Sequence, residues 1–191
     1  MRKIAIFGGS FDPIHKAHIQ VAQLALQLYK LNTIFFVIAI KPPNKSIQYA
    51  NIIDRINMLQ IATYNLKHMK ISLYEVNKHR TVYSYQTLDY FQRKYSKAKI
   101  YMIIGSDCVL NFHSWRNICY IKKHYNLIVI NRPGVNISKN EINYYNCIND
   151  KVYDISSTMI RQLIKDKNNK ASLYLNPQVY KYILKNSLYT K

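Results

Sequence analysis

Apolar runs alternate with segments of helical periodicity along the whole chain. Runs rich in β-branched and aromatic residues predict six strands, at residues 3–7, 33–40, 70–76, 99–104, 126–131 and 151–155. Apolar positions three or four apart predict six helices, at residues 18–31, 52–66, 83–95, 115–123, 158–167 and 178–188. Because several strands are almost continuously apolar and alternate with helices, we expect an α/β fold. It would be a doubly wound parallel sheet with helices on both faces.

One stretch of the chain, residues 132–150, lacks either pattern. It begins with the turn signal Pro133-Gly134 and is rich in Asn, so we interpret it as a surface excursion and not as a linker. A chain of 191 residues is of single-domain size. We therefore expect one domain over residues 1–191, with a small helical part at about residues 156–191.

The chain is strongly basic, with a formal net charge of +19. A nucleic-acid partner would explain this charge, but so would a bias toward Lys, Asn, Ile and Tyr, which share A/T-rich codons. The lysines are scattered and form no block of five or six, which favours the bias. In either case the positive field attracts anionic substrates.

Targeting signals are missing from the chain. No apolar signal segment precedes the first strand, and no run approaches the roughly 18 apolar residues of a membrane span. We therefore expect a cytoplasmic protein with no membrane partner.

The three cysteines argue against a disulfide framework because their number is odd. Cys108, His113, Cys119 and His124 have a spacing that superficially resembles a zinc site. They lack the usual C-x2-C knuckle, so we expect no metal site here.

The segment with the clearest chemistry is residues 8–18, GGSFDPIHKAH, which follows an apolar run. Glycines let the backbone approach a ligand closely, and Pro13 stiffens the turn. His15 and His18 follow it, and we expect His18 to open the first helix. Free N–H groups and the helix dipole favour anions at such a position.

A second candidate segment is residues 155–161, ISSTMIR. Ser156 or Ser157 is a good helix N-cap and would expose backbone N–H groups there. Arg161, one turn further on, would reach the same anion with its planar guanidinium. Together these groups would form a phosphate cradle.

A third candidate segment follows the strand predicted at residues 99–104. Gly105 ends this strand, Asp107 follows at its carboxyl edge, and Trp115 comes eight residues later. Asp107 would accept ribose hydroxyls, and Trp115 would stack on an aromatic ring. The alternative is that Asp107 caps a helix and Trp115 belongs to the core.

These segments carry a resemblance to a known family. GGSFDPIHKAH and ISSTMIR resemble the GGxFDPxHxGH and ISSTxxR motifs of the HxGH nucleotidyltransferases, whose fold is Rossmann-like. The G-x-D-x4-F-x2-W pattern from Gly105 to Trp115, and Pro-Pro-Asn-Lys at residues 42–45, resemble the bacterial-type nicotinate mononucleotide adenylyltransferases. The resemblance covers essentially the whole chain. The departures are Ala17 in place of the glycine of HxGH, Asn44 in the usual PPHK loop, and Val82 at the start of the usual SYT.

The resemblance implies an enzyme of NAD biosynthesis. It would join ATP, as its Mg²⁺ complex, to nicotinate mononucleotide, giving deamido-NAD and pyrophosphate without a tightly bound cofactor. It implies His15, His18 and Arg161 as the catalytic residues. For ATP binding it implies Gly8, Gly9, Ser10, Phe11, His15, His18, Gly105, Asp107, Ile155, Ser156, Ser157 and Arg161. For mononucleotide binding it implies Ser10, Phe11, Pro43, Lys45, Tyr83, Ser84, Thr87, Asp107, Trp115 and Arg132.

Two other functions stay open on the sequence. A pantetheine-phosphate adenylyltransferase shares the first two motifs, but Asp107, Trp115 and the Pro-Pro-Asn-Lys loop favour a pyridine mononucleotide. A basic RNA-binding protein on this fold would show strongly salt-dependent binding, and we expect no nucleic-acid partner. The preference between acid and amide mononucleotides and the oligomeric state, homo-oligomers included, are left open.

Overall fold

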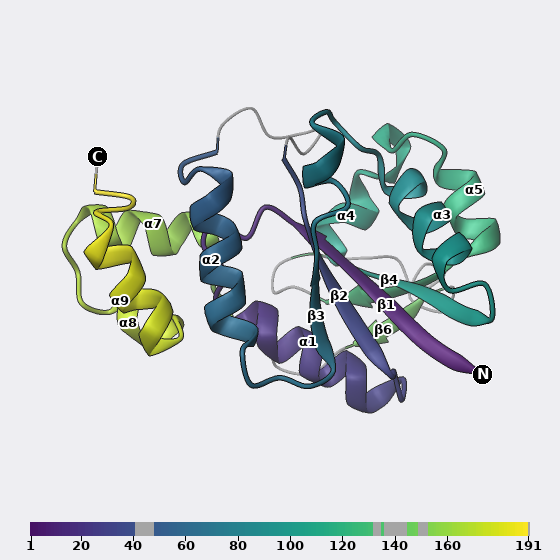
Figure 1. Ribbon diagram of the computed structural model, residues 1–191, viewed down its shortest axis with the longest axis horizontal. Helices are drawn as coiled ribbons and strands as arrows, with labels where there is room; N and C mark the ends of the chain where they lie inside the picture. Colours follow the sequence, from purple (N-terminus) through teal and green to yellow (C-terminus); the bar gives the residue numbers. More distant parts are fainter. Residues whose placement is uncertain (41–47, 132–134, 136–144, 149–152, 191) are drawn as a thin grey trace.

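A single parallel sheet forms the centre of the molecule (Figure 1). The computed structural model describes residues 1–40, 48–131, 135, 145–148 and 153–190. Within these residues, the strands lie in the order β3-β2-β1-β4-β5-β6, and every neighbouring pair is parallel. The strands are β1 (Arg2–Gly9), β2 (Thr33–Ile38), β3 (Met69–Ser72), β4 (Ala98–Gly105), β5 (Asn126–Ile130) and β6 (Asn146–Ile148). The expected fold class is confirmed.

The strand order fixes where a ligand is expected. From β1 the chain moves outward to β2 and β3, and then returns to β4 on the other side of β1. The connections therefore leave the sheet in opposite directions at the carboxyl ends of β1 and β4. In open α/β sheets ligands bind in the crevice at such a switch point.

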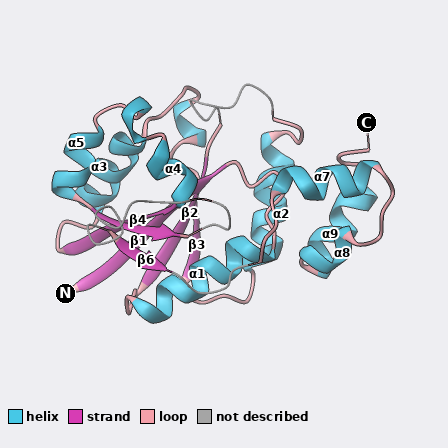
Figure 2. Cartoon of the chain, turned by 180° about the vertical axis from the view of Figure 1, so that it is seen from behind, coloured by secondary structure: helices cyan, strands magenta, loops and turns pink. Residues whose placement is uncertain are grey.

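Helices cover both faces of the sheet (Figures 1 and 2). Helices α1 (Lys16–Leu28) and α2 (Ile52–Thr63) cover one face, and α3 (Ser84–Lys94), α4 (Ser106–Leu110) and α5 (Ile118–His124) cover the other. Beside α2 lie the C-terminal helices α7 (Ser157–Lys165), α8 (Ala171–Tyr174) and α9 (Pro177–Lys185). Two short 3-10 helices are η1 (Val76–Lys78) and η2 (Phe112–Ser114). Among the described helices, none is both long and apolar enough to cross a membrane.

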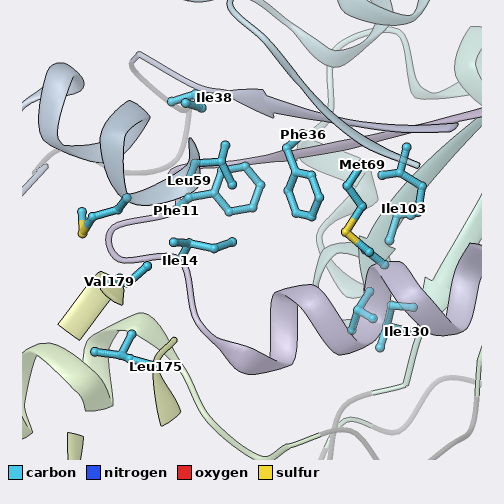
Figure 3. Close-up of a cluster of buried hydrophobic side chains, with 14 of the residues drawn as sticks. Phe11, Ile14, Phe36, Ile38, Leu59, Met69, Ile103, Ile130, Leu175 and Val179 are labelled. Carbon is cyan, nitrogen blue, oxygen red and sulfur yellow. The ribbon is translucent and has the colours of Figure 1, made fainter. Parts of the chain in front are cut away.

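The core is divided by the sheet into two clusters. Side chains alternate between the faces of a strand, so Phe36 of β2 belongs to the cluster under α1 and α2, and Phe35 to the cluster under α3 and α5. The first cluster extends beyond the sheet (Figure 3). It contains Phe11 from the loop after β1 and Val179 from α9. The C-terminal helices are thus packed into the same core as the first loop.

Three expectations about the elements are wrong, in whole or in part. Residues 153–155, the described part of the strand expected at residues 151–155, form no strand, and the last described strand is β6, where Ile148 pairs with Ile130 of β5. Ile148 is buried, so part of the segment that we interpreted as a surface excursion belongs to the core. The first helix begins at Lys16 with His15 as its N-cap, so His18 lies within the first turn instead of opening the helix.

Candidate functional site

The candidate site lies at the carboxyl ends of β1 and β4, beginning with Gly8 and Gly9. A Cβ on Gly8 would meet no atom within 4 Å, whereas one on Gly9 would lie only 3.0 Å from the Phe11 ring. Phe11 has a left-handed backbone, with φ of 48°, and the residue is 2% exposed. Glycine at position 9 therefore lets the chain fold back and bury this ring.

The two histidines of the first loop stack on each other. Their ring centroids lie 3.7 Å apart, and the Phe11 and His18 rings pack edge to face with their centroids 5.2 Å apart. The Nδ1 atom of His18 accepts a hydrogen bond of 3.3 Å from the backbone N–H of His15. A ring nitrogen that accepts carries no proton, so in the neutral ring the proton is on Nε2. His18 thus keeps an Nε2–H donor in the neutral ring.

The second segment, at the start of α7, is bonded directly to this loop. Ser156 is the N-cap of α7, and its hydroxyl accepts a bond of 3.2 Å from the backbone N–H of Met159. The Ser157 hydroxyl donates to the carbonyl of Pro13 at 2.9 Å. Ile155 lies half-buried immediately before them. The two predicted ATP-binding segments, 144 residues apart at this bond, are therefore adjacent in space.

Arg161 completes this part of the site. Its Nη1 donates to the backbone carbonyl of Asp12 at 2.7 Å, and its Nη2 donates to the Thr158 hydroxyl at 3.1 Å. Its guanidinium also lies over the Tyr49 ring, 4.1 Å from the centroid. These two hydrogen bonds use two of the five N–H groups of the guanidinium. The other N–H groups of the guanidinium are compatible with a bound anion.

Two buried polar side chains bind the backbone around the first loop. The carboxylate of Asp12, 4% exposed, accepts bonds from the backbone N–H groups of Tyr49 (2.8 Å) and Ala50 (3.1 Å). Arg55, 2% exposed, donates from Nη1 to the carbonyls of Ser10 (3.0 Å) and Ala39 (2.8 Å). Burial lowers the pKa of Arg55, and the Asp12 carboxylate opposes that shift. Arg55 thus joins the start of the first loop to the chain after β2.

The predicted mononucleotide residues lie around the start of α3 and the segment after β4. Tyr83 is the N-cap of α3, and Ser84 is the first residue of that helix. The Arg116 guanidinium lies 5.0 Å from the Tyr83 ring centroid, which joins α3 to the segment that carries Trp115. Trp115 is half-buried and meets the edge of the Phe112 ring at 5.2 Å. This leaves both a packing and a binding role for its indole.

The carboxyl end of β4 carries two further predicted residues. Gly105 is the N-cap of α4, and Asp107 lies in the first turn of that helix, half-buried. The N-cap is thus Gly105 and not Asp107, so the capping role in the alternative interpretation is wrong, although a carboxylate in the first helical turn interacts favourably with the helix dipole. Asp107 also lies beside the carboxyl end of β1, where nucleotides bind in open α/β sheets. Pro43, Lys45 and Arg132 lie outside the described residues.

Thr87 has a partner that sequence reasoning missed. Its hydroxyl, on a residue 3% exposed, donates to Oε1 of Glu75 at 2.7 Å. Burial raises the pKa of Glu75 to about 7, and the Thr87 hydrogen bond works against that shift. Thr87 therefore anchors the first turns of α3 to the chain that follows β3.

The described residues contain no group of three or more His, Cys, Asp or Glu side chains able to hold a metal ion. Cys108, Cys119 and Cys147 are not joined in a disulfide, and Cys119 is exposed. The described side chains and backbone at the switch point offer imidazole, guanidinium, hydroxyl and backbone N–H groups. This set of donors suits phosphate oxygens.

Comparison with known proteins agrees with this arrangement. A model of the family described as cytidylyltransferase-like matches residues 6–163. A protein of Endomicrobium trichonymphae named probable nicotinate-nucleotide adenylyltransferase is 50% identical over 99% of this chain and its own full length. A protein of Clostridium perfringens with the same name is 35% identical over the full length of both chains.

A solved structure has the same architecture as this chain. It is the nicotinic acid mononucleotide adenylyltransferase of Plasmodium falciparum complexed with NaAD. The TM-score is 0.84 and the sequence identity 26%, and the match covers 99% of this chain and 98% of that one. The same Plasmodium enzyme complexed with APC gives a TM-score of 0.82 at 25% identity.

Proposed function

The chain belongs to the cytidylyltransferase-like family and, within it, to the nicotinate-nucleotide adenylyltransferases, and we propose that it joins ATP and nicotinate mononucleotide at the switch point of its sheet. The products are deamido-NAD and pyrophosphate. The single observation that carries this proposal is the direct bonding of the His15–His18 loop to the Ser157–Arg161 segment. It supports one phosphate site built from both ends of the chain.

The reaction needs no general base. A phosphate monoester has its second pKa near 6 and is largely dianionic at pH 7. One of its oxygens attacks the α-phosphorus of ATP, a new P–O bond forms, and the bond from the α-phosphorus to the bridging oxygen breaks. Pyrophosphate leaves with that bond pair. The task of the protein is to align two anions and to stabilise the charge that develops.

We assign the ATP side to the two bonded segments. The Nε2–H of His18, with His15, donates to the α-phosphate and the bridging oxygen. Arg161 and the backbone N–H groups at Ser156 and Ser157 hold the β- and γ-phosphates. Mg²⁺ enters with ATP as part of the substrate, ligated mainly by phosphates and water.

The remaining predicted residues of the ATP side line the nucleoside. We assign this role to the backbone of Gly8, Gly9, Ser10 and Phe11, and to Gly105, Asp107 and Ile155.

We assign the mononucleotide side to the start of α3 and to the segment after β4. Tyr83 and Ser84 lie at the N-terminus of an eleven-residue helix, which favours an anionic group. Trp115 offers a ring face for stacking on the pyridine. The acid form of the mononucleotide follows from the names of the relatives.

The proposal is tested by product analysis. We expect Mg·ATP and nicotinate mononucleotide to give pyrophosphate and deamido-NAD in equal amounts, measured by chromatography. A His18→Ala protein prepared identically serves as the control for contaminating activity. Pyrophosphate without the dinucleotide would mean that water is the acceptor, and the proposal would be wrong.

A further inference from the structure

The last residues of the chain reach the loop that carries the catalytic histidines. Helix α9 ends in a Schellman turn, in which the N–H of Ser187 bonds to the carbonyl of Leu184 (3.1 Å) and that of Leu188 to the carbonyl of Ile183 (3.0 Å). Ser187 takes the left-handed conformation that this turn requires, with φ of 49°. The turn ends the helix and sends Tyr189 into the core cluster that also contains Phe11.

Tyr189 makes a buried hydrogen bond there. Its hydroxyl donates to Oδ1 of Asp12 at 2.7 Å, across 177 residues of sequence. Tyr189 is 9% exposed and Asp12 is 4% exposed, so water does not replace this bond easily. Burial and the Asp12 carboxylate raise the pKa of Tyr189, so the hydroxyl keeps its proton and acts as a donor.

We propose that Tyr189 is a positioning residue for the ATP site and acts through Asp12 on Arg161. Asp12 has two roles at once, since its carboxylate accepts from Tyr189 while its backbone carbonyl accepts from Arg161. Fixing the carboxylate therefore fixes the carbonyl that orients the guanidinium. This inference rests on the proposed function, in which Arg161 holds the ATP phosphates.

A second tyrosine of the same region provides a matched control. The Tyr182 hydroxyl, on α9, donates to Oδ1 of Asp54 on α2 at 2.8 Å and accepts from Nδ2 of Asn57 at 2.9 Å. It thus also joins the C-terminal region to a carboxylate, but not to the first loop. Tyr189→Phe and Tyr182→Phe each remove one hydroxyl and keep the ring.

The experiment measures kcat and both KM values for the two variants, with thermal unfolding as a check on folding. We expect Tyr189→Phe to lower kcat/KM for ATP about tenfold, at the low end for losing a hydrogen bond to a charged group. The KM for nicotinate mononucleotide should stay within about twofold of wild type. Tyr182→Phe should keep kcat/KM for ATP within about twofold. Equal losses in both variants would mean that Tyr189 only docks the C-terminal helices, and the proposal would be overturned.

A double-mutant cycle tests the route through Arg161. If Tyr189 acts through Arg161, Tyr189→Phe should weaken ATP binding less than about twofold in an Arg161→Ala background. Full additivity of the two changes would contradict that route. The dissociation constant of a non-hydrolysable ATP analogue is the readout, so the cycle does not depend on turnover. If wild type bound the analogue but formed no deamido-NAD, the proposed function would fail while this test would still decide the role of Tyr189.

Discussion

Glu75 should make the stability of the protein depend on pH near neutrality. Its carboxyl is half-buried, and its pKa rises from 4.5 to about 7 on folding because burial disfavours the charge. Between these two values the folded chain keeps a proton that the unfolded chain has released. Raising the pH through this window therefore lowers the free energy of unfolding. The stability that comes from keeping Glu75 protonated is fully present only below about pH 4.5.

The size of the effect follows from the same values. One pKa unit corresponds to about 1.4 kcal/mol, so the difference between 4.5 and about 7 sets an upper limit of about 3–4 kcal/mol. Residual water at a half-buried carboxyl reduces this, and we expect about 1–2 kcal/mol. Glu75→Gln removes the titration and keeps an oxygen to accept the hydrogen bond from Thr87.

The assay is urea unfolding of wild type and Glu75→Gln at pH 4.5, 6, 7 and 8 and constant ionic strength. Between pH 4.5 and pH 8, the free energy of unfolding of the variant should rise by about 1–2 kcal/mol relative to that of wild type. All other titrating groups are common to both proteins and cancel in this difference. Asp154→Asn, which removes an exposed carboxylate, should leave the pH dependence as in wild type. A difference between wild type and Glu75→Gln that does not change with pH would refute the reasoning.

The remaining predictions concern the site itself. His18→Ala should lower kcat at least about a hundredfold, the low end for losing one charge-stabilising donor, with an unchanged circular dichroism spectrum; near-normal turnover would remove His18 from the reaction. Arg161→Ala should raise the KM for ATP at least about tenfold and leave that for the mononucleotide nearly unchanged; unaltered ATP kinetics would exclude a triphosphate contact. Trp115→Ala should raise the KM for the mononucleotide more than that for ATP, and the reverse order would mean that the two pockets are exchanged. Asp12→Asn should cost about 2–3 kcal/mol in urea unfolding, because its amide would face the backbone N–H donor of Tyr49 or Ala50 at a buried side chain; a loss under about 0.5 kcal/mol would contradict this.

The sequence was informative where local rules decide the structure. The apolar run before Gly8 predicts β1, and the alternation of strands and helices predicts the parallel sheet, which is confirmed. The motifs also predicted that residues 8–18 and 155–161 share one site. The bonds from Ser157 and Arg161 to the first loop bring these segments together, while the roles of the individual residues stay predictions.

The features that the sequence did not predict depend on contacts between residues far apart in the chain. Strand β6 has only three residues and lies in a polar stretch, so its pairing with β5 and not its own pattern makes it a strand. The Tyr189–Asp12 and Thr87–Glu75 hydrogen bonds belong to no periodic pattern. A weak signal for Asp12 was available, since the chain has only nine Asp and Glu residues and this one stands inside the first motif.

The central claim is that the acceptor is a pyridine mononucleotide bound opposite ATP. Its most direct test compares kcat/KM, by pyrophosphate release with saturating Mg·ATP, for nicotinate mononucleotide, nicotinamide mononucleotide and phosphopantetheine. We predict the highest value for nicotinate mononucleotide and no measurable turnover of phosphopantetheine. A higher kcat/KM for phosphopantetheine than for either mononucleotide would contradict the account.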